Sequence, residues 1–105
     1  MSTVTTHVLD LSRGCPAAGL EVILCKGEQE IGRSRTNTDG RITGWDAGID
    51  AGAYRLRFET KAWFQIQSID TFYPFVEIHF EVAPDKQYHI PLLLSPWGYS
   101  TYRGS

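Results

Sequence analysis

The sequence predicts an all-β protein, a sandwich of short antiparallel strands with one short helix. Polar residues alternate with apolar or β-branched residues over most of the 105-residue chain, which is the period of a strand with one buried face. Clusters of Gly, Pro, Asn and Asp divide these runs at short intervals, as turns do in a sandwich. A chain of this length is expected to form a single domain, residues 1–105, around one core.

The first half of the chain contains four expected strands. They are placed at residues 4–9, 20–24, 31–36 and 41–45. A turn at 13–16 separates the first two, and 26–30 reads as a hairpin-like connection. The third strand is polar and is expected near a sheet edge. Asn37–Gly40 is a strong turn signal, because Gly tolerates a positive φ and Asn and Asp side chains hydrogen-bond their own backbone. A loop rich in Gly and Asp is expected at 46–52.

The second half of the chain contains the expected helix and three further strands. The strands are placed at residues 53–58, 76–82 and 88–94. In the first of these, Tyr54, Leu56 and Phe58 share one face. The helix is expected at 60–68, with Thr60 as its N-cap. Pro91 has no N–H to donate, so the last strand is expected to have an edge or a bulge at that point.

The charge and cysteine content narrow the class of protein. The net charge of −2 comes from interspersed charges, without the basic patch that binds nucleic acid or an anionic membrane surface. No apolar stretch reaches the ~20 residues of a membrane span, and the first residues do not resemble a signal peptide. We expect a cytoplasmic protein, or a periplasmic one if a leader has been removed. Cys15 and Cys25 match no zinc or redox spacing, and Cys25 is expected in the core.

Three histidines are candidates for acid–base chemistry. His89 lies in a strand with two apolar faces, one of which is expected to pack on the core and the other on a second subunit. A histidine on that second face is partly desolvated, which shifts its pKa and suits proton transfer, although a structural role is the alternative. His7 lies on the polar face of the first strand, where a side chain usually meets solvent. His79 is expected on a solvated strand face.

Arg41 and the C-terminal tail are the other candidates. Arg41 follows the Asp-Gly turn, and its guanidinium either reaches solvent or presents its planar donors to a carbonyl or an anion. The tail, 99–105, contains two tyrosines and an arginine where chain ends are usually frayed, which predicts an ordered tail with a polar role. The histidines are too scattered for a metal site, and no nucleotide fingerprint is present. We therefore expect neither a metal nor a cofactor.

Four segments of the chain carry specific motifs. In chain order they are THVLD with GCPA (6–17), TNTDGR (36–41), YHIPLLLSP (88–96) and GYSTYRGS (98–105). Together they resemble the 5-hydroxyisourate hydrolase family, the transthyretin-related enzymes, over the whole chain. The ending Tyr102–Ser105 is the most specific part, since true transthyretins share the fold but lack it. Cys15 and Trp97 depart from the residues common in the family, and neither is expected to touch the chemistry.

The resemblance implies a fold, an assembly and a reaction. The fold is a transthyretin-like (prealbumin-like) sandwich of two four-stranded sheets with one short helix, assembled as a homotetramer with sites between its two dimers. The reaction belongs to urate degradation in purine metabolism. It is the hydrolysis of 5-hydroxyisourate to 2-oxo-4-hydroxy-4-carboxy-5-ureidoimidazoline, in which a water activated by histidine opens the N1–C6 amide bond without a cofactor.

The resemblance also implies the roles of particular residues. The catalytic residues are His7, Arg41, His89 and Ser105. The substrate-binding residues are His7, Arg41, Tyr102, Arg103 and Gly104. Two points stay open: which histidine is the general base, and whether Ser105 acts through its hydroxyl or through the terminal carboxylate.

Two other functions compete with this hypothesis. One is a transthyretin-type carrier of a small apolar ligand, which is disfavoured because His7, Arg41 and His89 would make the binding channel polar and charged. The other is a plain β-sandwich interaction module, which predicts no ordered tail and no turnover.

Overall fold

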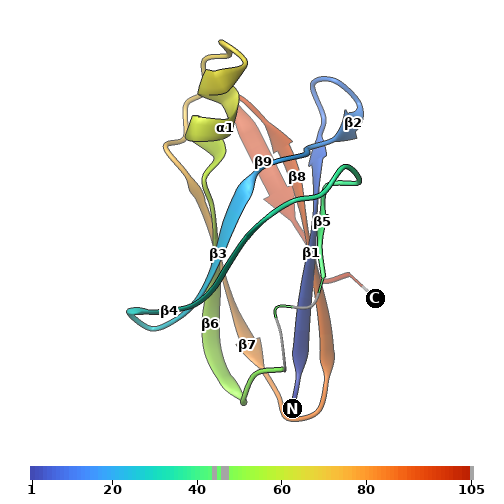
Figure 1. The fold of residues 1–105 in the computed structure, drawn as a ribbon, viewed down its shortest axis with the longest axis vertical. Helices are drawn as coiled ribbons and strands as arrows, with labels where there is room; N and C mark the ends of the chain where they lie inside the picture. The colour runs from blue at the N-terminus through green and yellow to red at the C-terminus, as the bar shows by residue number, and fades with distance from the viewer. Residues whose placement is uncertain (44, 46–47, 105) are drawn as a thin grey trace.

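The chain forms nine strands and one helix in the computed structural model, which describes residues 1–43, 45 and 48–104 (Figure 1). The strands are β1 (Thr3–Asp10), β2 (Cys15–Pro16), β3 (Glu21–Lys26), β4 (Gln29–Arg35), β5 (Arg41–Ile42), β6 (Gly52–Phe58), β7 (Val76–Val82), β8 (Gln87–Ser95) and β9 (Gly98–Thr101). The helix α1 (Thr60–Ile66) lies between β6 and β7 at one end of the molecule. No helix in the described part of the chain is long and apolar enough to cross a membrane.

The strands form two facing sheets, as predicted. One has the order β2-β1-β8-β9, with the two-residue β5 as an additional partner of β1, and the other has the order β4-β3-β6-β7. All strand pairs are antiparallel except β1 with β8, which are parallel. This pair departs from the antiparallel expectation. A tight hairpin forces its two strands to be antiparallel, but β1 and β8 are joined through the whole second sheet, so they can run in the same direction.

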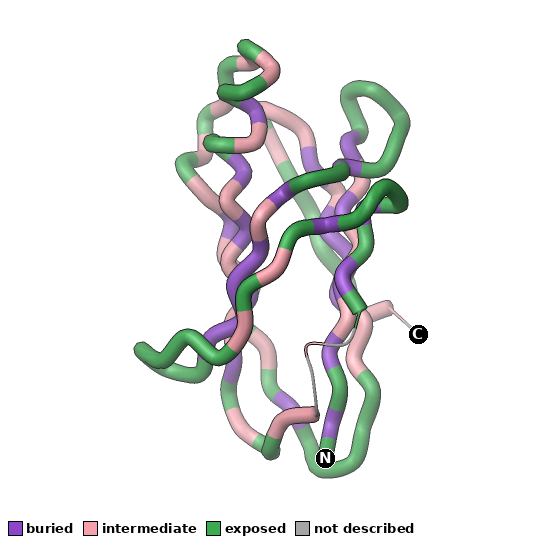
Figure 2. The backbone as a smooth tube through the Cα atoms, in the orientation of Figure 1, coloured by how far each residue is buried: buried purple, intermediate pink, exposed green. Residues whose placement is uncertain are grey.

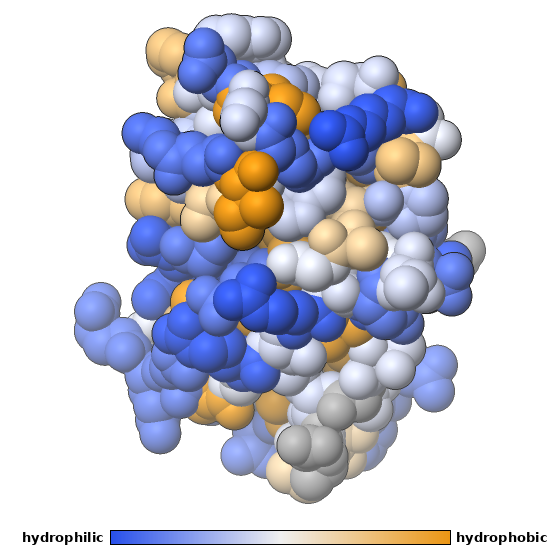
Figure 3. All heavy atoms as spheres, turned by 45° about the horizontal axis from the view of Figure 1, so that its top comes forward, coloured by the Kyte–Doolittle hydropathy of each residue, from blue (hydrophilic) through white to orange (hydrophobic). Residues whose placement is uncertain are grey.

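The core lies between the sheets, where alternate strand residues point inward (Figure 2). In β1, every second residue from Val4 to Asp10 is buried. In β6, Tyr54, Leu56 and Phe58 share one face, as predicted, and this face is buried. Cys25 is also buried, as predicted. Hydrophilic side chains cover most of the face seen in Figure 3, with separate apolar patches between them. The outward positions on this face are therefore mostly polar, and apolar side chains interrupt them only in places.

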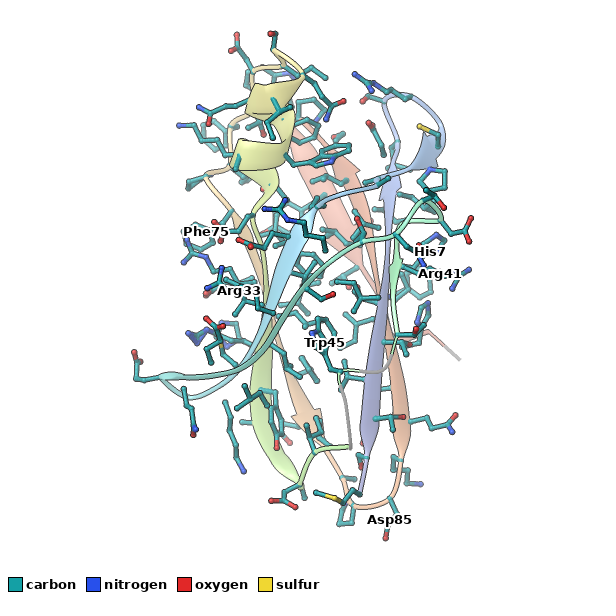
Figure 4. The ribbon with its side chains drawn as sticks, in the orientation of Figure 1. His7, Arg33, Arg41, Trp45, Phe75 and Asp85 are labelled. Carbon is teal, nitrogen blue, oxygen red and sulfur yellow. The ribbon has the colours of Figure 1, made fainter. Side chains whose placement is uncertain are left out.

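Two local predictions were wrong. Glu59, not Thr60, is the N-cap of α1; Thr60 is the first helical residue and is buried with Phe64, so core packing decides its place. The expected strand at 41–45 ends at Ile42. Trp45 instead turns into the space between the layers, where its ring packs against Gly32 and the core (Figure 4). Gly44 and part of the expected 46–52 loop, Asp46 and Ala47, lie outside the described residues.

The edge predicted from Pro91 is confirmed. β9 pairs with β8 only from Leu92 to Ser95, so Pro91 lies just beyond this ladder. The next contact along the same strand is an isolated bridge between His89 and Gly104. This gap in the pairing leaves room for the C-terminal tail to approach β8 beside His89.

Candidate functional site

The outer face of the β1–β8 pair combines polar and apolar side chains. The parallel register places three pairs on it: Thr5 with His89, His7 with Pro91, and Leu9 with Leu93. Their strand neighbours point into the core, so these six side chains point away from it. Pro91 is buried and the other five are half-buried. The predicted outward placement of His7 and His89 is thus observed, and the two histidines share one surface.

Arg41 reaches this surface through the predicted turn. The side-chain oxygen of Asn37 accepts a hydrogen bond from the backbone N–H of Arg41 at 3.0 Å, and Gly40 has a φ of 75°. Gly40 packs so closely on β1 that a Cβ there would overlap the carbonyl oxygen of Val8. β5 then pairs Arg41 directly with His7. Figure 4 shows the two residues side by side, on the side of β1 that faces away from the second sheet.

His89 lies next to both residues. Its ring centroid is 6.5 Å from that of His7, and its Nδ1 is 2.8 Å from the hydroxyl of Thr5. Burial lowers the pKa of His89 below the ordinary histidine value, and the neighbouring Arg41 and His7 lower it further. His89 is therefore neutral at neutral pH, which is the form that can accept a proton.

The C-terminal tail returns to His89. The backbone N–H of Gly104 donates a hydrogen bond to the carbonyl oxygen of His89 at 2.8 Å. A Cβ at Gly104 would lie 2.6 Å from Cδ2 of the His89 ring, so the close approach requires glycine. The guanidinium of Arg103 lies 4.9 Å from the centroid of the Tyr88 ring, an arrangement typical of a cation–π contact. Gly104 thus anchors the tail on β8, whereas Tyr102 is 59% exposed; Ser105 lies outside the described residues.

A pocket of about 440 Å³ opens on this surface, large enough for a small heterocycle. It is lined by Thr3, Thr5, Arg41, Gln87, Tyr88 and His89. Two predicted residues, Arg41 and His89, line it, and His7 lies beside it. Thr3, Thr5, Gln87 and Tyr88 were not predicted from the sequence. The one signal for Thr5 was its spacing of two residues from His7, and its contact with His89 depends on the β1–β8 register.

The charges at this site have no ionic partner among residues 1–43, 45 and 48–104. None of the ion pairs in the described part of the chain includes Arg41 or His89. His79 differs, because its side chain is 71% exposed and lies 3.5 Å from the carboxylate of Glu77, which confirms its predicted solvated position. A neutral imidazole can take a proton from water, and a guanidinium beside it can stabilise an anion that develops nearby.

A metal site is not evident among the described residues, which contain no group of three or more His, Cys, Asp or Glu side chains placed to hold a metal ion. The absence of a metal and of a cofactor remains a prediction.

The fold and the site define a class: small β-sandwich proteins with a pocket for a small polar molecule on the outer face of one sheet. Residues 4–104 match the model of the HIUase/Transthyretin family, and the chain belongs to this family. The resemblance predicted from the four sequence segments is confirmed.

Relatives with two different names share this fold. A mouse 5-hydroxyisourate hydrolase is 43% identical, over 99% of this chain and 96% of its own. The solved structure of Klebsiella pneumoniae 5-hydroxyisourate hydrolase superposes with a TM-score of 0.94 at 40% identity, covering 100% of this chain and 94% of that one. Sea bream transthyretin, solved in complex with thyroxine, has a TM-score of 0.92 at 27% identity, covering 97% and 94%. Because a hydrolase and a transthyretin share this fold, the function of this chain has to be argued from the site.

Proposed function

We propose that this protein is a 5-hydroxyisourate hydrolase of urate degradation. The observation that carries the proposal is the grouping of His7, Arg41 and His89 on one outer sheet face, with Arg41 and His89 lining an open pocket. The relatives from mouse and Klebsiella pneumoniae that bear this name support it, because the chain matches nearly their full lengths.

The proposed reaction adds water across the N1–C6 amide bond of the substrate. One of the two histidines, His7 or His89, takes a proton from water while the water oxygen forms a bond to C6. The C6–N1 bond then breaks, N1 receives a proton, and C6 becomes the carboxylate of 2-oxo-4-hydroxy-4-carboxy-5-ureidoimidazoline. A positioned base of this kind contributes ~10²–10⁴-fold in rate. The lowered pKa of His89 supports its presence in the neutral form at neutral pH.

Arg41 and the tail are proposed to hold the substrate. The guanidinium of Arg41 binds a substrate oxygen and stabilises the negative charge that develops on it, an effect that is often among the largest in catalysis. Gly104, Arg103 and Tyr102 are proposed to bind the planar ring, and Ser105 to act at the catalytic centre. The hydrogen bond from Gly104 to His89 supports a tail that ends beside the pocket.

We further propose a homotetramer, a dimer of dimers, in which the outer face of the β1–β8 pair meets its counterpart from another dimer. The half-buried Leu9 and Leu93, next to His7 and Pro91 on this face, support this, since apolar side chains on an outer face favour contact with another surface. A second copy over the pocket would exclude water and strengthen the electrostatic contacts within it. Light scattering on the purified protein measures the mass of the assembly, and a monomer would contradict the proposed assembly.

The cytoplasm is the proposed location. Cys15 is exposed and Cys25 is buried, and both are free thiols, as is usual in reducing compartments. Cell fractionation tests this location.

The experiment that tests the function follows the ultraviolet decay of 5-hydroxyisourate, made freshly from urate with uricase. The decay is recorded with and without the protein at a concentration far below that of the substrate. A catalyst accelerates the decay through many turnovers, whereas the spontaneous decay supplies the baseline. A transthyretin-type carrier leaves the rate of decay unchanged, and that result from a folded protein would overturn the proposed function.

A further inference from the structure

A threonine on the neighbouring strand contacts the ring of His89. The hydroxyl of Thr5 lies 2.8 Å from Nδ1 of His89, a short distance for a hydrogen bond between a hydroxyl and an imidazole. Thr5 and His89 are direct partners in the parallel β1–β8 ladder, so two regular strands hold this contact in place. The contact belongs to the framework of the sheet and needs no loop to order.

His89 has further contacts that fix its ring and its main chain. Gly104 lies against its Cδ2 edge, where even a Cβ would be too close. The backbone bond from Gly104 to the His89 carbonyl fixes the main chain at the same residue. Arg41 and His7 are the charged and titratable groups that lower its pKa. Within the described residues, no hydrogen bond is formed by Nε2 of His89, which makes Nε2 the ring nitrogen available to a ligand in the pocket.

We propose that Thr5 is a positioning residue for catalysis: its hydroxyl accepts a hydrogen bond from Nδ1–H of His89 and thereby fixes the tautomer in which Nε2 is the unprotonated base. This inference rests on the proposed hydrolase function and deepens it by choosing His89 as the base. The ring nitrogen that a partner holds determines which nitrogen is left to act.

The proposed proton transfer requires this direction of the hydrogen bond. In the neutral ring, a proton on Nδ1 directs the lone pair of Nε2 to the pocket, where water and substrate arrive. When Nε2 takes a proton from water, Nδ1 keeps its own, so the bond to Thr5 persists through the step. In the opposite arrangement, Thr5 would donate to Nδ1 and that bond would have to reverse whenever the ring became charged. A hydroxyl oxygen has two lone pairs, and that of Thr5 accepts no other hydrogen bond among the described residues, so both are open to Nδ1–H.

The first test reads the tautomer directly in the wild-type protein. Nitrogen-15 NMR of the imidazole rings distinguishes a protonated from an unprotonated ring nitrogen, at a pH where His89 is neutral. The expected result is a proton on Nδ1 of His89 and none on Nε2. A proton on Nε2 would overturn the proposal. This readout does not depend on turnover, so it remains decisive even if the protein proves not to hydrolyse 5-hydroxyisourate.

The second test compares three variants. Thr5→Val keeps a β-branched side chain in the strand but removes the hydroxyl, Thr5→Ser keeps the hydroxyl, and Thr71→Val is the matched control. Thr71 is also half-buried and also uses its hydroxyl, which bonds the Pro96 carbonyl at 2.7 Å beyond the far end of β8. Thr5→Val is expected to lower kcat by ~10–100-fold, as loss of a partner that orients a functional histidine does. KM should change little.

The expected pattern is specific to a positioning role. Thr5→Ser should restore most of kcat, Thr71→Val should behave as the wild type, and the His89 signals of Thr5→Val should lose the single Nδ1–H form. Wild-type kcat in Thr5→Val, or a Thr5→Ser variant as slow as Thr5→Val, would contradict the proposal. If Thr5→Val fails to fold, the kcat of Thr5→Ser and the tautomer of His89 in the wild type still test the proposal.

Discussion

The two outer faces of the sandwich are both polar, but their charges are organised differently. On the second sheet, Arg33 lies 3.0 Å from Glu21 and 2.7 Å from Glu30, and Arg55 lies 3.3 Å from Glu77. The bond to Arg33 lowers the pKa of Glu30 below its usual range. On the first sheet, Arg41 and the two histidines have no carboxylate partner in the described part of the chain, and the half-buried Leu9 and Leu93 lie on the same outer face.

This difference in charge pairing is what we expect between a solvated surface and a binding site. A charge already matched by a neighbouring side chain gains little from a ligand, and an exposed pair contributes little stability. A charge without a partner remains available to a substrate, and partial burial strengthens that interaction. His79, which is exposed and lies 3.5 Å from Glu77 on the second sheet, therefore serves as an internal comparison for His7 and His89.

The tail should give the largest effect. Deletion of residues 102–105 removes the chain segment that ends against His89, so turnover is expected to fall to the spontaneous rate while the strands keep their fold. Decay of 5-hydroxyisourate measures the activity and circular dichroism measures the fold. Full activity in a folded, truncated protein would make the tail merely structural.

The histidines come next. His7→Ala and His89→Ala are each expected to lower kcat by ~10²–10⁴-fold, the range for loss of a positioned acid or base. His79→Ala is the matched control on the paired face and should retain the wild-type rate. Initial rates at saturating substrate measure the three variants. Wild-type rates in both single variants would remove the histidine mechanism.

Arg41→Gln should have a somewhat smaller effect on the rate. Loss of one group that stabilises developing negative charge costs ~10²–10³-fold in kcat. Arg55→Gln removes an arginine of the other face and serves as the comparison. That variant should keep full activity and lose about 1 kcal/mol or less of unfolding free energy, the range for a surface ion pair. Activity loss in Arg55→Gln as large as in Arg41→Gln would mean that the two faces do not differ in function.

The pH dependence sharpens the same contrast. Because burial, Arg41 and His7 lower the pKa of His89, its neutral form persists below the ordinary histidine value, and the acid limb of kcat/KM should lie below pH ~6.5. In Arg41→Gln this limb should move to higher pH, since a positive charge that opposes protonation is gone. Burial remains, so the limb should stay below pH ~6.5. Rates corrected for spontaneous decay at each pH give the position of the acid limb. A limb that moves to lower pH in Arg41→Gln would contradict the proposed effect of the Arg41 charge.

Local signals were enough to predict much of the fold and part of the site. The period of two put Tyr54, Leu56 and Phe58 on one shared face, which proved to be the buried one, and turned His7 outward. The Asn-Thr-Asp-Gly turn explained why a strand begins at Arg41, because its geometry is set by the turn residues themselves. Such features depend on neighbours a few residues away, which a sequence displays directly.

The features that were missed depend on distant parts of the chain. Thr5 meets His89 across 84 residues, and the contact exists only because β1 and β8 pair in parallel with that register. Trp45 lies outside any strand and packs against Gly32, and Thr60 is buried in the core and does not cap α1. In each case tertiary packing outweighed the local preference, and no local pattern reports such packing.

The most direct test of the account removes the charges of each face separately. One variant combines His7→Ala, Arg41→Gln and His89→Ala on the first sheet, and the other combines Arg33→Gln, Arg55→Gln and His79→Ala on the second. The measurement is kcat/KM for 5-hydroxyisourate, with circular dichroism to verify the fold of both proteins. The account predicts that the first variant falls to the spontaneous rate and that the second retains the wild-type value. Retained activity in the folded first variant, or an equal loss in both, would contradict it.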